Sequence, residues 1–264
     1  MTLRPTRMGA MLRHRENWRC RRAGPVAGLV LVLALGLCAT EARAVGLGAQ
    51  LLGYRSEVQY LLGQHMKLVA LVAFFSVGLG VPLGIWLSRP AMRRYSEGVM
   101  QVLNIGTTVP TLAKLAIAML FFGLGTGSAV IGLTIATLMP IVRNTCVGLQ
   151  NVSAELLDAA RGLGMRHGQI LWRVELPNAL NVIVSGIRTA ITYATGTAAL
   201  AFLIGGGGLG ELIFTGIDTN EPAMMLAGAI TTCLLAVLVD LLLYQVQYWL
   251  IPRGVNPYRP LRAG

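Results

Sequence analysis

Residues 155–177 read ELLDAARGLGMRHGQILWRVELP, and they separate two long apolar segments, 128–148 and 178–204. This stretch carries charged side chains of both signs. A charged side chain at the centre of a bilayer costs roughly 2.5–3.5 kcal/mol, so the stretch is expected to lie outside lipid while its neighbours cross it. The sequence therefore predicts a membrane protein in which residues 155–177 form a loop between two spans.

Local propensities predict that this loop is a helical hairpin. Ser153 can cap a short helix whose first turns hold Glu155 and Asp158, where the positive end of the helix dipole favours acidic side chains. Gly164 can adopt a left-handed conformation and end that helix. A second short helix is expected to follow, and Pro177 suits the first turn of the next span.

A small-residue face is expected on this hairpin from Ala159 and Ala160, which are also strong helix formers. Such a face can enter a groove on a partner protein. The alternative interpretation is a plain amphipathic linker between two membrane spans.

The composition of the chain is that of an integral membrane protein. Of 264 residues, 55% are hydrophobic and 12% are charged, whereas soluble domains average about 25% charged residues. The apolar runs are long and do not alternate, so they predict membrane helices, an all-α polytopic fold, and not a barrel. The four cysteines are scattered without metal-ligand spacing, and no metal or other cofactor is expected.

Six apolar segments are candidate spans, each of which needs about 20 residues. They cover residues 24–40, 66–88, 98–123, 128–148, 178–204 and 223–250. The first is short, follows seven arginines between Arg4 and Arg22, and ends at Ala42-Arg43-Ala44. A cleaved signal peptide and a retained signal anchor both fit this pattern, and the sequence leaves the two open.

This pattern divides the chain into three parts. Residues 1–60 form a basic N-terminus with the first apolar segment and a short periplasmic stretch. Residues 61–255 form a transmembrane domain that includes the loop 153–177, and residues 256–264 form a cytoplasmic tail.

The distribution of basic residues predicts the orientation in the membrane. Cytoplasmic loops of membrane proteins carry an excess of lysine and arginine. If the N-terminus is cytoplasmic, 17 of the 22 basic residues fall on the cytoplasmic side. The loop 153–177 and the C-terminus are then cytoplasmic, and the net charge of +11 is explained by orientation, with no nucleic-acid partner implied.

The spacing within the loop resembles the cytoplasmic EAA loop of bacterial ATP-binding-cassette importer permeases. That pattern is Glu-Ala-Ala, three residues, Gly, nine residues, then Ile-x-Leu-Pro. This sequence keeps the spacing and departs conservatively at two positions, with Asp158 for Glu and Val174 for Ile. The resemblance implies that the following residues couple the chain to an ATPase: Glu155, Asp158, Ala159, Ala160, Gly164, Val174, Leu176 and Pro177.

Four other stretches resemble permeases for glycine betaine, carnitine and choline. They are residues 107–124, 138–148, 203–217 and 221–254. The resemblance implies a type I importer permease fold with a core of five transmembrane helices, plus the N-terminal apolar segment. It also implies the permease subunit of an osmoprotectant importer in the bacterial inner membrane.

The same resemblance implies partners. A separate ATPase dimer would grip the hairpin, and a periplasmic binding protein would deliver solute near residues 205–222 and make the main choice of cationic headgroup. The chain would work with a second copy of itself or with a paralogue, in contact with membrane lipid. No P-loop motif occurs in the sequence, so the chain is expected to be a transport subunit without an ATPase site of its own.

Two alternatives stay open at this point. A permease for methionine or another amino acid would share the glycine-rich stretch, Gly205, Gly206, Gly207, Gly208 and Gly210, which is expected to form a tight turn at the outer membrane face. An ion-coupled secondary transporter would need no ATPase, and would use charges within its spans.

Candidate pathway residues lie within the apolar segments: Thr107, Thr108, Pro110, Lys114, Arg188 and Asp240. Pro110 is expected to kink the third span, because proline removes a backbone hydrogen bond. Lys114 either pairs with Asp240 or lines the pathway and meets a substrate carboxylate; the alternative is that it snorkels to the membrane surface or forms a local structural pair.

Overall fold

The computed structural model describes residues 47–251, and this part of the chain is helical, without strands. The chain divides into two units, Met1–Gly53 and Tyr54–Gly264. Of the first unit, the structure describes only the short helix α2 (Leu47–Gly53). The apolar segment 24–40, its A-x-A site and the tail 256–264 lie outside the described residues.

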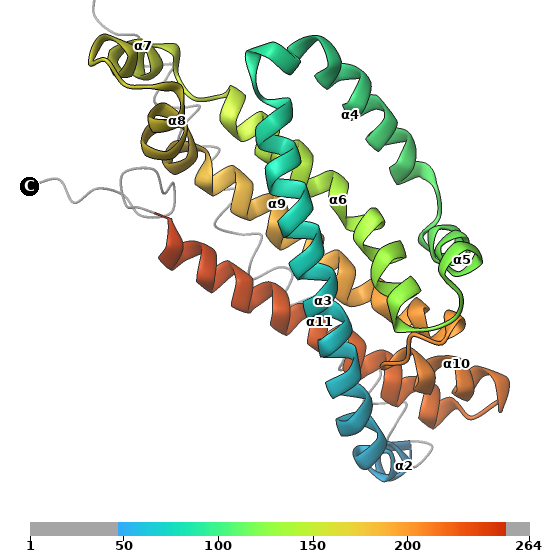
Figure 1. Cartoon of the computed structure of the whole chain (residues 1–264). Coiled ribbons are helices and arrows are strands. Elements are labelled where there is room, and N and C mark those ends of the chain that lie inside the picture. The colour runs from blue at the N-terminus through green and yellow to red at the C-terminus, as the bar shows by residue number, and fades with distance from the viewer. Residues whose placement is uncertain (1–46, 252–264) are drawn as a thin grey trace, which may run out of the picture. The chain divides into compact units, whose positions relative to one another are not determined.

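Long apolar helices make up the second unit (Figure 1). Within the described residues, four stretches are long and apolar enough to cross a membrane, and the number becomes five if one bent helix pair counts as a single span. The four are α3 (Arg55–Leu87), α6 (Thr126–Gln150), His167–Ile204, which contains α9 (Leu176–Thr197), and α11 (Pro222–Leu250). The all-α polytopic prediction is confirmed.

The bent pair corrects the prediction of one kinked span at 98–123. The chain forms two helices instead, α4 (Arg93–Thr108) and α5 (Thr111–Phe122), whose axes differ by 99°. Val109 is extended at φ −69° and ψ 126°, because a residue that precedes proline is pushed out of the helical region. Pro110 therefore breaks the helix completely and does more than bend it.

Helix α6 is the central element, since it packs against α3, α5 and α9. Small residues allow the close approach. A Cβ on Gly84 of α3 would lie 2.5 Å from the Cβ of Thr145, and one on Gly186 of α9 would lie 2.6 Å from the Cβ of Asn144. Membrane helices use such small-residue contacts because burial from lipid gives them little hydrophobic driving force.

Shorter elements close both ends of the bundle. They are the 3-10 turn Pro90–Met92, α7 (Ala154–Gly162), α8 (His167–Ile170), the π-helical turn Leu171–Glu175, the 3-10 helix Ala198–Ile204 and α10 (Gly210–Asp218). In Figure 1, α7 and α8 lie at one end of the bundle and α10 lies at the other. Helix α10 begins at Gly210, the last residue of the glycine-rich stretch.

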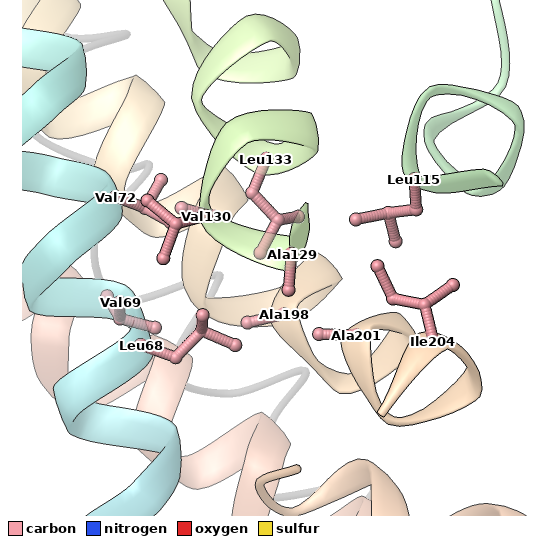
Figure 2. Packing of buried hydrophobic residues seen from close by; sticks show 11 residues of the cluster. Leu68, Val69, Val72, Leu115, Ala129, Val130, Leu133, Ala198, Ala201 and Ile204 are labelled. Atoms are coloured by element: carbon pink, nitrogen blue, oxygen red, sulfur yellow. The ribbon is translucent and has the colours of Figure 1, made fainter. Parts of the chain in front are cut away.

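One apolar cluster joins α3, α5, α6 and the 3-10 helix that follows α9 (Figure 2). Figure 2 shows Leu68 and Val72 of α3 on one side and Leu115 of α5 on the other, with α6 side chains between them. The buried members are Leu68, Val69, Val72, Leu115, Ala129, Val130, Leu133, Ala194, Ala198, Ala201 and Ile204. This cluster fixes the position of the short helix α5 against the bundle.

A buried histidine holds the glycine-rich stretch in place. His65 of α3 is fully buried, with Nε2 2.9 Å from the carbonyl oxygen of Thr195. The backbone N–H of Leu209 donates to Nδ1 at 3.4 Å, so the ring proton belongs on Nε2 and is donated to Thr195. The adjacent Gln64 accepts a hydrogen bond from the N–H of Gly208 at 3.3 Å. Residues 64 and 65 thus connect α3 to α9 and to the turn.

Replacing this histidine should destabilise the protein. In His65→Leu the side chain keeps a similar size, but the Thr195 carbonyl and the Leu209 N–H lose their partner, which costs roughly 1–3 kcal/mol for buried groups. Denaturant unfolding of the purified protein in detergent measures this change. Lys67→Met, at an exposed position of the same helix, is the control; equal stability of the two variants would contradict the assignment.

Candidate functional site

The hairpin at residues 153–177 forms as its sequence predicts at the first helix. Ser153 is the N-cap of α7, and the N–H of Leu156 donates to its hydroxyl oxygen at 3.4 Å. Glu155 lies in the first turn. Gly164 has φ +74°, the left-handed conformation expected of it. The N–H of Gly164 donates to the Arg161 carbonyl at 2.9 Å and that of Met165 to the Ala160 carbonyl at 3.2 Å, which is the hydrogen-bond pattern of a glycine C-cap.

The second half of the hairpin is shorter than expected. Helix α8 has a single turn, and the π-helical turn Leu171–Glu175 joins it to α9. Pro177 lies in the first turn of α9, as predicted. Val174 and Leu176 are half-buried, so they orient the hairpin on the bundle.

The residues of the hairpin that were expected to contact an ATPase differ in their exposure. Glu155, Asp158 and Ala159 are exposed, whereas Ala160 is buried. The expected small-residue face therefore includes Ala159 but not Ala160, which packs inward. Asp158 forms an exposed ion pair with Arg161 at 2.8 Å.

Large apolar side chains on the same hairpin are exposed, which was not predicted. Leu163 is 77% exposed and Trp172 is 72% exposed, and Leu156 is exposed as well. A tryptophan within a charged loop was the available signal. Leu156 and Leu163 lie between the candidate spans, and Trp172 lies near the start of the stretch His167–Ile204.

An ion pair attaches the hairpin to α3. The guanidinium of Arg89, just after α3, lies 2.7 Å from a carboxylate oxygen of Glu175, whose side chain is only 14% exposed. Arg89 also donates to the Ser88 hydroxyl at 2.9 Å and to the Ile85 carbonyl at 3.2 Å. The signal in the sequence was a carboxylate placed between Val174 and Leu176.

The glycine-rich stretch turns tightly at the opposite end of the bundle, as predicted. Gly205, Gly207 and Gly208 have φ of +76°, +70° and +90°. Gly206 and Gly210 are buried, and a Cβ on Gly210 would lie 1.8 Å from the Ala199 carbonyl oxygen.

Tyr54 and Glu221 lie just before α3 and α11 respectively. A hydrogen bond to Glu221, with a smaller contribution from burial, raises the pKa of the Tyr54 phenol.

The break between α4 and α5 exposes polar groups in the middle of the bent pair. Thr107, Thr108 and Pro110 are exposed. The two threonine hydroxyls donate to the carbonyls of Asn104 and Ile105 at 2.6 and 2.8 Å. Both hydrogen bonds therefore stay within α4, and neither connects the break to another helix.

A hydrogen bond nearby joins the break to α9. The hydroxyls of Thr111, the first residue of α5, and Tyr193 of α9 lie 2.6 Å apart. Ser185, Thr189 and Tyr193, spaced four residues apart, are exposed on one side of α9. We call these three residues the polar side of α9. This polar side was not predicted, although polar residues at helical spacing within an apolar segment were the signal.

Arg188 and Asp240 form an ion pair between α9 and α11. Arg188 Nε and Nη2 donate to the two carboxylate oxygens of Asp240 at 2.7 and 2.5 Å. Thr192 donates to the same carboxylate at 3.1 Å, and the guanidinium lies 5.0 Å from the centre of the Tyr244 ring. The hypothesis that Lys114 pairs with Asp240 is wrong, because Arg188 occupies this carboxylate in a bidentate geometry.

This pair should behave as a unit in stability measurements. Arg188→Leu or Asp240→Leu removes one member of the ion pair and should destabilise the protein by about 3–5 kcal/mol, whereas the double variant should recover most of the loss. Unfolding of the four proteins in detergent gives the coupling energy, with Lys114→Leu combined with Asp240→Leu as the control pair. Additive losses for Arg188 and Asp240 would contradict the assignment.

Comparison with known proteins gives the family and the relatives. Residues 80–254 match the family described as "Binding-protein-dependent transport system inner membrane component". The chain is 48% identical over 199 residues to the osmoprotectant import permease protein OsmY of Salmonella typhimurium, covering 75% of this chain and 84% of the relative. It is 39% identical over 213 residues to the carnitine transport permease protein OpuCD of Listeria monocytogenes, with 79% and 92% covered. It is 40% identical over 203 residues to the choline transport system permease protein OpuBD of Bacillus subtilis, with 76% and 87% covered.

Among solved structures, the fold is similar to a chain of the MetNI methionine ABC transporter in an inward-facing conformation. The TM-score is 0.65 at 21% sequence identity, and the match covers 75% of this chain and 96% of that chain. This likeness establishes the permease fold. Together with the family match over residues 80–254, it leads to one conclusion: the chain belongs to the family of binding-protein-dependent transport system inner membrane components.

Proposed function

We propose that this chain is the permease subunit of an ATP-driven importer of osmoprotectants, solutes such as glycine betaine, carnitine and choline. The observation that carries the proposal is the 48% identity to OsmY along 84% of that permease. The carnitine and choline permeases, at 39% and 40% identity, support the same solute class. The names of these three relatives refer either to osmoprotectants or to a quaternary ammonium solute.

The hairpin is the proposed contact with a separate ATPase dimer. Its exposed apolar residues, Leu163 and Trp172, project from a segment that also carries exposed Glu155 and Asp158. The ion pair between Arg89 and Glu175 joins this contact to α3. A movement of the hairpin would therefore pull on α3 directly.

The proposed orientation places the hairpin in the cytoplasm. Arg161, Arg166 and Arg173 belong to the hairpin. At the same end of the bundle, Arg89 follows α3, and Arg93 and Arg94 are the first two residues of α4. Acidic Glu211, Asp218 and Glu221 are exposed at the other end. This asymmetry agrees with the excess of basic residues on cytoplasmic loops.

The glycine-rich turn and α10 would then face the periplasm, where a binding protein delivers solute. The solute pathway is proposed to run along the polar side of α9 and the break at Thr107, Thr108 and Pro110. These groups are exposed in the single chain, and polar groups are not expected to face hydrocarbon. A second copy of the chain, or a paralogue, would complete the wall of the pathway.

Neither alternative finds comparable support. The methionine transporter is 21% identical and indicates the fold alone, whereas the osmoprotectant, carnitine and choline permeases are about twice as similar. An ion-coupled carrier would have no use for a hairpin that binds an ATPase, and the family match includes the whole hairpin.

Gly164 offers a sharp test of the coupling. Gly164→Val forces a branched side chain into φ +74°, whereas Gly162→Val adds the same atoms two residues earlier, where φ is helical; neither added Cβ meets a neighbour within 4 Å. Backbone strain of this kind costs about 1–3 kcal/mol. We expect solute-stimulated ATP hydrolysis to fall about tenfold or more in Gly164→Val and to be little changed in Gly162→Val.

The measurement uses proteoliposomes that contain the chain, its ATPase and its binding protein, with glycine betaine, carnitine, choline and methionine offered in turn. Stimulation by methionine alone would contradict the substrate class. Uptake that needs no ATP and survives Gly164→Val would contradict the importer mechanism.

A further inference from the structure

Lys114 carries a charge that no other described residue balances. It lies in the first turn of α5, half-buried. The ion pairs within residues 47–251 are Arg89–Glu175, Arg161–Asp158 and Arg188–Asp240, and none includes Lys114. Asp240, the carboxylate expected from the sequence to pair with Lys114, is already bound by Arg188. A charge within a membrane span normally faces water, another charge or a ligand.

Tyr193 presents an aromatic ring close to this lysine. Tyr193 is 43% exposed, and the hydrogen bond between its hydroxyl and that of Thr111 holds it against the start of α5. Thr111 and Lys114 are three residues apart in one helix, so their Cβ atoms lie about 5–6 Å apart. The hydrogen bond at 2.6 Å therefore places the phenol of Tyr193 within about one helical turn of Lys114.

The two side chains suit opposite ends of one small molecule. An ammonium group of a lysine binds a carboxylate, and the face of an aromatic ring attracts a quaternary ammonium. Glycine betaine and carnitine carry both groups a few bonds apart, whereas choline has the quaternary ammonium and no carboxylate. Because like charges repel, the carboxylate must lie toward Lys114 and the ammonium toward Tyr193.

We propose that Lys114 and Tyr193 form a subsite in the permease that favours zwitterionic quaternary ammonium solutes over cationic ones. The inference rests on the proposed function and names a specificity determinant within it. One ring is not a cage, so the subsite adds to the selection made by the binding protein. The polar side of α9, which contains Tyr193, gives a solute access to it.

The test must separate the permease from the binding protein. Uptake into proteoliposomes is therefore measured at a fixed, saturating amount of binding protein already loaded with radiolabelled glycine betaine, carnitine or choline. Lys114→Met removes the charge and keeps the length, and Lys114→Arg restores the charge. Lys67→Met is the control, because Lys67 is the other lysine of the chain and is exposed on α3. Tyr193→Leu removes the ring, and Tyr193→Phe removes only its hydroxyl.

We expect Lys114→Met to lower uptake of glycine betaine and carnitine about tenfold relative to choline, with recovery in Lys114→Arg and no change in Lys67→Met. Tyr193→Leu should lower uptake of all three solutes, and Tyr193→Phe should retain most of it. Equal losses for choline and glycine betaine in Lys114→Met, or no loss for either, would overturn the subsite while the wild type still transports. If the wild type takes up none of the three solutes, the proposed function itself fails and the subsite with it.

Discussion

The absence of water from the bilayer core is the constraint on which the structure depends, because every polar group within the spans must then bind protein or face a water-filled space. The ion pair between Arg188 and Asp240 meets this condition inside the protein. His65 meets it by bonding the backbone of two other elements. The polar side of α9 remains exposed in the single chain, so it requires either water or a second protein surface.

Helix α3 connects the glycine-rich turn at one end of the bundle to the hairpin at the other. Near one end, His65 and Gln64 hold the glycine-rich turn; just after the other end, Arg89 holds the hairpin through Glu175. The helical part of this connection, from His65 to Leu87 at the end of α3, covers about 33 Å at the rise of an α-helix. A helix of this length can carry a displacement from the hairpin at one end of the bundle to the glycine-rich turn at the other.

The sequence predicted the features that depend on local chemistry. The cap at Ser153, the left-handed Gly164 and the position of Pro177 follow from neighbouring residues alone, and the structure has all three. Features that depend on contacts between distant segments could not be predicted. Lys114 was the partner that the sequence suggested for Asp240, whereas the packing of α9 on α11 pairs Asp240 with Arg188. Likewise, Pro110 indicated that the helix is interrupted, but it did not predict the angle of 99° between the two helices.

The central claim is that the polar side of α9 faces water and not lipid, and cysteine labelling tests it most directly. In a cysteine-free variant that still transports, Ser185→Cys and Thr189→Cys are exposed to a charged, membrane-impermeant thiol reagent supplied on both sides of the membrane. Leu238→Cys and Leu241→Cys, at exposed apolar positions of α11, are the controls. We predict that the reagent modifies positions 185 and 189 and spares 238 and 241. Equal protection of all four positions would contradict a water-filled pathway along α9.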